Sequence, residues 1–351
     1  MRARKSRSLL VLVAAVLLGL AVLTSDLYLP GLPQRPAELP AAVVTVGDST
    51  LSGEGGGNYE RGTNGENGNW CHRSPAAPVN QLHLPPTVTR INLACSGAGS
   101  ADLQIVPGPE RSQAEQLGEL ARRYRITDVV VAVGANDDPD FIDTVNRCVE
   151  AWVRRAEEGC SAQLRESWPQ HVAQMRPKVL AALGDIRRVL DEAGYTPASY
   201  SLILQSYASP VGPGIRPELH GLSGCPFQTT DMAWIRDTGV PQLSAGLQAA
   251  AREAGARFLD LSRAGRGHEA CTGDPRTAEG EWFTRLTVDW ESLQDDRRAP
   301  HAMQESFHPN AAGHAQIASC LGEFMATEDR RAACLPDERG DLHAVPASET
   351  R

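Results

Sequence analysis

Short apolar runs alternate along this chain with longer segments of helical periodicity, and this alternation constrains the possible folds most strongly. Five runs have the length and the β-branched or apolar residues typical of strands: 43–46, 87–93, 127–133, 200–205 and 256–261. Helices are predicted between and after them, at 160–193, 242–254 and 311–327. Strands that alternate with helices form βαβ units and a parallel sheet. We therefore predict an α/β fold, a three-layer α/β/α sandwich around a flavodoxin-like, five-stranded parallel sheet.

The longest predicted helix has one apolar stripe, because its apolar residues recur at steps of three and four. The stripe consists of Val172, Met175, Val179, Leu180, Leu183, Ile186 and Leu190. Pro177 lies within this segment, and an internal proline removes a backbone donor and clashes with the preceding turn. We expect the helix to be kinked or split there.

The beginning of the chain predicts an export signal followed by a spacer. Residues 1–25 contain four basic residues before an apolar run at 9–23, as signal peptides and signal anchors do. Residues 26–40 are rich in proline and predict an extended linker. We expect a secreted protein, or one tethered to a membrane through 9–23 with its domain outside. The domain is predicted at 41–335, and the polar tail at 336–351 is expected to be disordered.

Size and charge narrow the class of partner. The chain has 351 residues and 41% hydrophobic residues, which suits one large α/β domain. Its net charge is -9 and its aromatic content is 5%, so neither a broad basic face nor a stacking platform for bases is indicated. We expect a monomer that does not bind nucleic acid.

Eight cysteines in a chain with an export signal predict disulfides. Pairing nearest neighbours closes the shortest loops: Cys71 with Cys95, Cys148 with Cys160, Cys225 with Cys271, and Cys320 with Cys334. Other connectivities stay open on this evidence. The absence of a C-x-x-C pair in the sequence disfavours a zinc ribbon or a redox motif, and no metal site is predicted.

Three predicted strands are each followed at once by a turn that carries a polar residue or a glycine. Ser49 follows the first strand, and a serine hydroxyl at the carboxyl edge of a parallel sheet is a nucleophile if a base reaches it. Gly97 follows the second strand, where glycine lets a backbone N–H point at a ligand. Asn136 follows the third, and its amide is a donor suited to a developing oxyanion. Each turn alone is equally typical of ordinary loop structure.

The last helix is preceded by a candidate base. His308 stands just before this helix, on a loop fixed by Pro309, and imidazole can take the serine proton and return it to a leaving group. Glu305 stands three residues earlier, where a carboxylate can orient the ring. His314 falls inside the helix and is expected to be structural. Residues 53–70 are rich in glycine and asparagine and predict an ordered surface loop near the site. A calcium loop is disfavoured there, because the EF-hand spacing is absent.

Taken in order, these segments resemble the SGNH, or GDSL-type, hydrolase family over roughly residues 43–325. Several details are similar to its secreted actinobacterial esterase and lipase branch: 52–55 (Ser-Gly-Glu-Gly), 71–74 (Cys-His-Arg-Ser), 94–97 (Ala-Cys-Ser-Gly) and 305–310 (Glu-Ser-Phe-His-Pro-Asn). The resemblance implies the SGNH hydrolase fold, hydrolysis of small-molecule or lipid esters, and no cofactor. It is also compatible with the first three cysteine pairs, to which Cys320–Cys334 would be an addition.

The resemblance also implies a role for each candidate residue. Ser49 is the implied nucleophile and one oxyanion donor, through its own N–H. Gly97 supplies a second backbone N–H, Asn136 a side-chain N–H, and His308 is the base. The family usually has an aspartate where this chain has Glu305, and some members of the branch use a backbone carbonyl instead. Both alternatives for orienting His308 stay open.

Other functions remain beside the acyl esterase. A carbohydrate esterase that removes acetyl groups from polysaccharide would use the same residues, so only substrates distinguish it. A non-catalytic exported binding module predicts a missing nucleophile or base, and neither Ser49 nor His308 is missing. A nucleotide-binding enzyme is disfavoured for two reasons. The glycines at 53–57 do not match the G-x-G-x-x-G spacing at the start of a helix, and no Walker lysine follows them. Specificity is expected from the loops at 53–70, 210–230 and 265–294.

Overall fold

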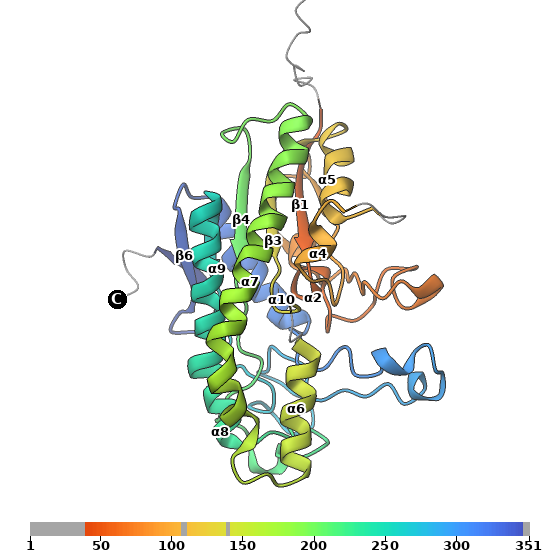
Figure 1. Cartoon of the computed structure of the whole chain (residues 1–351), viewed down its shortest axis with the longest axis vertical. Coiled ribbons are helices and arrows are strands. Elements are labelled where there is room, and N and C mark those ends of the chain that lie inside the picture. Colours follow the sequence, from red (N-terminus) through yellow and green to blue (C-terminus); the bar gives the residue numbers. More distant parts are fainter. Residues whose placement is uncertain (1–38, 107–110, 138–140, 347–351) are drawn as a thin grey trace, which may run out of the picture. The chain divides into compact units, whose positions relative to one another are not determined.

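A computed structural model describes residues 39–106, 111–137 and 141–346, and its core is a seven-stranded sheet in the order β2-β1-β3-β4-β5-β6-β7 (Figure 1). The strands are β1 (Ala41–Gly47), β2 (Thr89–Asn92), β3 (Arg125–Ala132), β4 (Ser201–Gln205), β5 (Arg257–Asp260), β6 (Arg331–Pro336) and β7 (Leu342–Pro346). All neighbouring pairs are parallel except β6 and β7. From β1 the chain continues to β2, on one side of β1. From β3 it continues to β4, in the opposite direction across the sheet. The carboxyl ends of β1 and β3 therefore flank the topological switch point, where open α/β sheets bind ligands.

Helices cover both faces of the sheet, in agreement with the predicted three layers. The α-helices are α2 (Ser49–Ser52), α3 (Pro78–Gln81), α4 (Ser100–Leu103), α5 (Gln113–Ala121), α6 (Phe141–Val153), α7 (Gly159–Glu192), α8 (Thr229–Trp234), α9 (Val240–Ala254) and α10 (Ala311–Met325). A π-helical turn, Ile235–Gly239, joins α8 to α9. In Figure 1, α5, α7 and α9 lie over one face of the strands, with α10 behind them.

Successive side chains of the central strands face opposite sides of the sheet and so contribute to two hydrophobic cores. Val44 of β1 pairs in register with Val129 of β3, and both belong to the core beneath α5, α7 and α9. Val43 and Val130 point the other way, into the core shared with α10. Because successive strand residues face opposite sides, a β-branched run buried on both faces needs helices on both. The apolar stripe of α7 meets one of these cores through buried residues such as Leu183.

The structure adds to the predicted elements at three places. β6 and β7 extend the expected five strands to seven. The tail was expected to be disordered from 336, and this is wrong over Leu342–Pro346, because β7 pairs with β6 and buries Leu342. Pro177 does not split the long helix, which runs from Gly159 to Glu192 with two prolines inside it. Its tertiary contacts on the buried stripe hold it together despite the lost backbone bonds.

All four nearest-neighbour cysteine pairs are disulfides: Cys71–Cys95, Cys148–Cys160, Cys225–Cys271 and Cys320–Cys334. The last of them joins α10 to β6. Within the ranges that the structure describes, no helix is long and apolar enough to cross a membrane. The predicted signal at 1–25 and the apolar run at 9–23 lie outside those ranges, as does most of the linker at 26–40.

Candidate active site

Ser49 stands at the carboxyl end of β1, where the backbone turns sharply. Gly47 has a φ of 136°, and a Cβ on it would lie 1.9 Å from the carbonyl oxygen of Ala132, so only glycine fits. The Asp48 carboxylate accepts a hydrogen bond from the Thr50 N–H at 3.1 Å and caps the short helix α2. This turn places the Ser49 side chain at the switch point between β1 and β3.

His308 meets Ser49 from the loop before α10. Its Nε2 lies 2.8 Å from the Ser49 Oγ, and the two residues are 9% and 8% exposed. Its Nδ1 lies 3.2 Å from the backbone carbonyl of Ser306, so Nδ1–H donates there and the Nε2 lone pair accepts the serine O–H. Burial lowers the pKa of His308, which the negative charge of Glu54 opposes. The ring is therefore neutral at pH 7 and able to accept a proton.

Glu305 does not hold the position expected of an orienting acid. Its carboxylate accepts a hydrogen bond from the Tyr59 hydroxyl at 2.7 Å, while the ring nitrogen of His308 has the Ser306 carbonyl as its partner. The assignment of Glu305 as the group that orients His308 is wrong in this geometry. The reason is local: the turn at 305–308 brings a main-chain oxygen to Nδ1 and sends the longer carboxylate toward Tyr59.

Of the two other expected oxyanion donors, Asn136 lines the same pocket as Ser49, and the turn of Gly97 lies next to Asn136. The Asn136 side chain donates to the carbonyl of Ala98 at 3.1 Å, which fixes Asn136 next to the Gly97 turn and leaves its second amide N–H for a ligand. Gly97 is exposed with a φ of 79°, directly after the Cys71–Cys95 disulfide. Asp137 holds the same two loops together through the Ser100 N–H at 2.8 Å. The loops after β2 and β3 are thereby fixed around the space above Ser49.

A hydrogen-bonded pair below Ser49 was not found from the sequence. Tyr207, which is half-buried, donates its hydroxyl proton to the fully buried Asp48. Burial raises the pKa of Asp48 to about 7, although the bonds from Tyr207 and the Thr50 N–H oppose the rise. The available signal was the position of Tyr207, two residues beyond the carboxyl end of β4, at the same edge of the sheet as Ser49.

A largely apolar pocket opens beside the Ser49–His308 pair. Asn136 lines it together with side chains from α6, α7, the π-helical turn and α9. Its apolar wall includes Phe141, Trp168, Val172, Met175, Trp234 and Leu243. The Phe141 ring meets the His308 ring edge to face, with centroids 5.3 Å apart. An apolar substituent of a molecule bound at Ser49 would therefore lie against the apolar wall of this pocket, without displacing water from polar groups.

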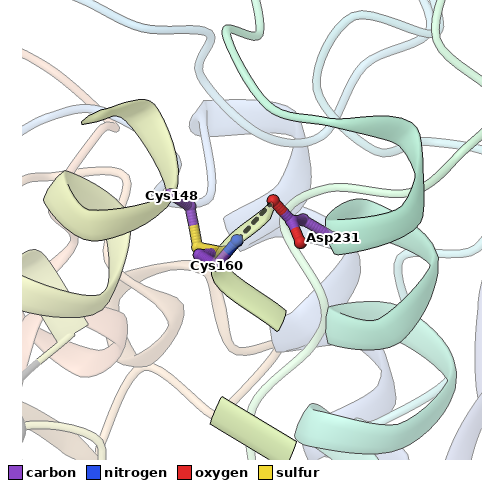
Figure 2. A group of neighbouring side chains, drawn as sticks. All are labelled: Cys148, Cys160 and Asp231. Atoms are coloured by element: carbon purple, nitrogen blue, oxygen red, sulfur yellow. Dashed lines mark hydrogen bonds between the residues drawn. A yellow bond between two sulfur atoms is a disulfide. The ribbon is translucent and has the colours of Figure 1, made fainter. Parts of the chain in front are cut away.

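Only one cluster in the described ranges has three side chains close enough for a metal ion: Cys148, Cys160 and Asp231 (Figure 2). The two cysteines form a disulfide, whose sulfurs have lost the thiolate charge that metal binding needs. The Asp231 carboxylate instead accepts the backbone N–H groups of Cys160 at 3.0 Å and Ser161 at 2.8 Å. Asp231 therefore satisfies the first N–H groups of α7, and the cluster is structural.

A serine–histidine pair at the switch point of a doubly wound sheet defines the class of this protein, a hydrolase built on a three-layer α/β/α sandwich. More specifically, the chain belongs to the GDSL-like lipase/acylhydrolase family, whose sequence model matches residues 45–316. This is a family of hydrolases that act on esters.

Three solved structures are similar to this chain. The extracellular lipase of Streptomyces rimosus is 22% identical, with a TM-score of 0.50 over 78% of this chain and 94% of the lipase. Phospholipase A1 from Streptomyces albidoflavus NA297 is 22% identical, with a TM-score of 0.48 over 78% and 94%. A carbohydrate acetylesterase from Sinorhizobium meliloti is 12% identical, with a TM-score of 0.39 over 82% and 98%. The likeness to the Streptomyces rimosus lipase shows the fold alone. No curated protein has a matching sequence.

Proposed function

We propose that this protein is a serine esterase that hydrolyses acyl esters through an acyl-enzyme on Ser49, with His308 as the general base. The observation that carries the proposal is the 2.8 Å contact between the Ser49 Oγ and the His308 Nε2 at the mouth of an apolar pocket. A neutral imidazole, fixed through its other nitrogen by a main-chain carbonyl, is the arrangement that a serine nucleophile needs.

The reaction follows from the parts in two similar halves. His308 takes the Oγ proton as Ser49 attacks the ester carbonyl, and the N–H groups of Ser49 and Gly97 and the Asn136 amide bind the oxyanion. Each such donor contributes roughly 3 kcal/mol to the stability of the transition state. Collapse breaks the bond to the alcohol, which leaves with the proton from His308. Water then attacks the acyl-enzyme by the same steps, and the acid is released.

The pocket favours an acyl group longer than acetyl. Its wall is mostly aromatic and aliphatic, with Trp168 and Trp234 packed edge to face at 5.9 Å. Burying each additional CH₂ of a chain in such a wall stabilises the bound state by about 0.8 kcal/mol. This favours lipid-type esters as substrates over the alternative, acetyl groups on polysaccharide.

The test is a series of p-nitrophenyl esters from acetate to palmitate, with Ser49→Ala assayed in parallel on the oxidised protein. We expect turnover that rises with chain length beyond acetate and is lost in Ser49→Ala, with the circular dichroism spectrum unchanged. Turnover that persists in Ser49→Ala would refute the nucleophile. A preference for acetate, or activity on acetylated polysaccharide alone, would favour the carbohydrate esterase.

A pocket variant tests where the acyl chain binds. Val172→Trp would fill part of the pocket, so the preferred chain should become shorter while acetate turnover is retained. Val153→Trp is the matched control, because Val153 is 56% exposed on α6 and should leave the preference unchanged. An unchanged preference in Val172→Trp would place the chain elsewhere.

We further propose that the protein is exported and works as a monomer on ester substrates, without nucleic acid, either released or tethered through residues 9–23. Four disulfides, three of them buried, support an oxidising location. Fractionating an expressing culture and sequencing the mature N-terminus separates release from tethering. Recovery of the reduced protein inside the cell would contradict export.

A further inference from the structure

A fully buried carboxylate, Glu54, belongs to a loop that packs on His308 and is not used by the reaction described above. Glu54 follows α2 in the loop after Ser49 and is 0% exposed. This loop packs directly on the base: a Cβ on Gly55 would lie 3.1 Å from the Cβ of His308. The carbonyl of Glu54 accepts a hydrogen bond from the His314 Nε2 at 2.9 Å, which attaches it to α10.

Three side chains hold the Glu54 carboxylate. His72 Nδ1 lies 2.9 Å from Oε1, the Tyr59 hydroxyl lies 3.0 Å from the same oxygen, and Gln304 donates to Oε2 at 2.9 Å. The Tyr59 hydroxyl also contacts Glu305, and its one proton serves one carboxylate at a time. A carboxylate with this many donors stays ionised even when buried. Burial acts to raise the pKa of Glu54, but the bond from His72 and the charge of His308 hold it below its ordinary value.

The charges that act on His308 come from few groups. Burial lowers the pKa of His308, the carboxylate of Glu54 raises it, and the neighbouring His72 acts to lower it. His314 is neutral near pH 7, because burial lowers its pKa to about 4. On the side of Ser49, Asp48 is paired with Tyr207. The negative charge on this face of His308 is therefore that of Glu54, tempered by His72.

We propose that Glu54 is the positioning carboxylate of this site: it acts through His308, stabilising the imidazolium that forms when Ser49 gives up its proton. The proton moves from the Ser49 Oγ to the His308 Nε2 and from there to the leaving alcohol; it does not pass to Glu54, which stays negative throughout. Serine hydrolases with an acid hydrogen-bonded to the imidazole obtain this stabilisation directly. Here the Ser306 carbonyl fixes the ring, and the charge comes from the Glu54–His72 pair. The inference rests on the proposed function of Ser49 and His308.

The test uses two variants with opposite expected effects on the acidic limb of the kcat/KM pH profile. Glu54→Gln removes the negative charge, so the limb should move down by about one pH unit, and kcat should fall about tenfold with KM little changed. His72→Gln leaves the charge of Glu54 uncompensated, so the limb should move up. Glu269→Gln is the matched control, because Glu269 is also a buried carboxylate but lies near Arg236. The acidic limb of the pH profile of this variant should stay at the wild-type position.

Nuclear magnetic resonance titration of the His308 ring protons separates this inference from the proposed function, because it needs no turnover. The resonances are assigned by their loss in His308→Ala, which also distinguishes His308 from Asp48 as the titrating group. The pKa of His308 should fall in Glu54→Gln, rise in His72→Gln and stay near the wild-type value in Glu54→Asp. These shifts in a protein that hydrolyses no ester would sustain the coupling and refute the proposed function.

A pKa of His308 that moves in neither variant, or in the same direction in both, would overturn the role of Glu54. If Glu54→Gln does not fold, His72→Gln and Glu54→Asp decide the question alone. An unchanged pKa of His308 in His72→Gln then overturns the inference.

Discussion

His308 has two carboxylates in its neighbourhood, and neither of them touches its Nδ1. The Ser306 carbonyl oxygen lies 3.2 Å from the His308 Nδ1, and the Glu305 carboxylate accepts a hydrogen bond from Tyr59 instead. Glu305→Ala should therefore lower kcat/KM only a few-fold, whereas His308→Ala should lower it by roughly 10⁴-fold or more. Steady-state kinetics on one p-nitrophenyl ester compares the two. Equal losses would show that the carboxylate of Glu305 does orient the ring.

Asp48 makes stability depend on pH in a direction opposite to that of an ion-paired carboxylate. Its folded pKa is raised to about 7, so the native state keeps a proton that the unfolded chain releases above about pH 4. The contribution of Asp48 to the free energy of unfolding is fully present below pH 4 and is lost as the pH rises to 7. This contribution is roughly 4 kcal/mol at most. Asp48→Asn mimics the protonated form and should flatten this dependence.

Urea unfolding of the disulfide-intact protein at pH 4.5 and pH 8 measures the effect. The difference between the two pH values should be smaller for Asp48→Asn than for the wild type, because other titrating groups are common to both proteins. An identical difference in the two proteins would mean that Asp48 is ionised across the range.

At the site, the sequence was informative where a residue follows its own strand. Ser49, Gly97 and Asn136 each come after a strand whose end the sequence predicts, so their meeting at one edge of the sheet was predictable. Glu54 and Tyr59 were not, because they lie in a polar glycine-rich segment that sequence alone places at the surface. Only packing against the loop of His308 and against α10 shows that Glu54 is buried.

At the scale of elements, the hairpin of β6 and β7 is part of the fold. Leu342 of β7 is 1% exposed and belongs to the core on the α10 side. Leu342→Ala should lower the free energy of unfolding by about 2–4 kcal/mol, through lost burial and the cavity left behind. Leu222→Ala is the control, since Leu222 is 61% exposed and should change stability little. Equal urea midpoints for the two variants would mean that β7 contributes nothing to the core.

The clearest predicted strands, β1 and β3, have buried runs rich in β-branched residues, whereas β6 lacks that signal. β6 has the sequence Arg-Ala-Ala-Cys-Leu-Pro, and alanine favours helices over strands. Its strand conformation comes from pairing with β5 on one side and β7 on the other. β6 and β7 are strands because they pair with adjacent strands of the sheet. A local window of sequence does not show which strands will pair.

For the whole molecule, the disulfides fix loops around the site and the end of the sheet. Cys71–Cys95 joins the loop before α3 to the turn of Gly97, and Cys225–Cys271 joins two of the loops from which specificity is expected. Reduction under native conditions should lower the melting temperature and the esterase activity together, since each bridge contributes about 2–4 kcal/mol. Calorimetry and activity with and without dithiothreitol test this. A reduced protein with unchanged stability would show that the folded core alone is sufficient.

The sequence by itself determined the α/β class, the first five strands and the residues at the strand ends, because each depends on local pattern. It favoured the nearest-neighbour disulfides, because these close short loops, but left other pairings open. The tertiary structure decided which group faces His308 Nδ1, that Glu54 is buried beside His308, and that the chain continues the sheet past residue 336. These features depend on contacts between segments far apart in the chain. Glu305 and Ser306 are adjacent in the sequence, and only the folded loop shows that the imidazole meets the Ser306 carbonyl while Glu305 meets Tyr59.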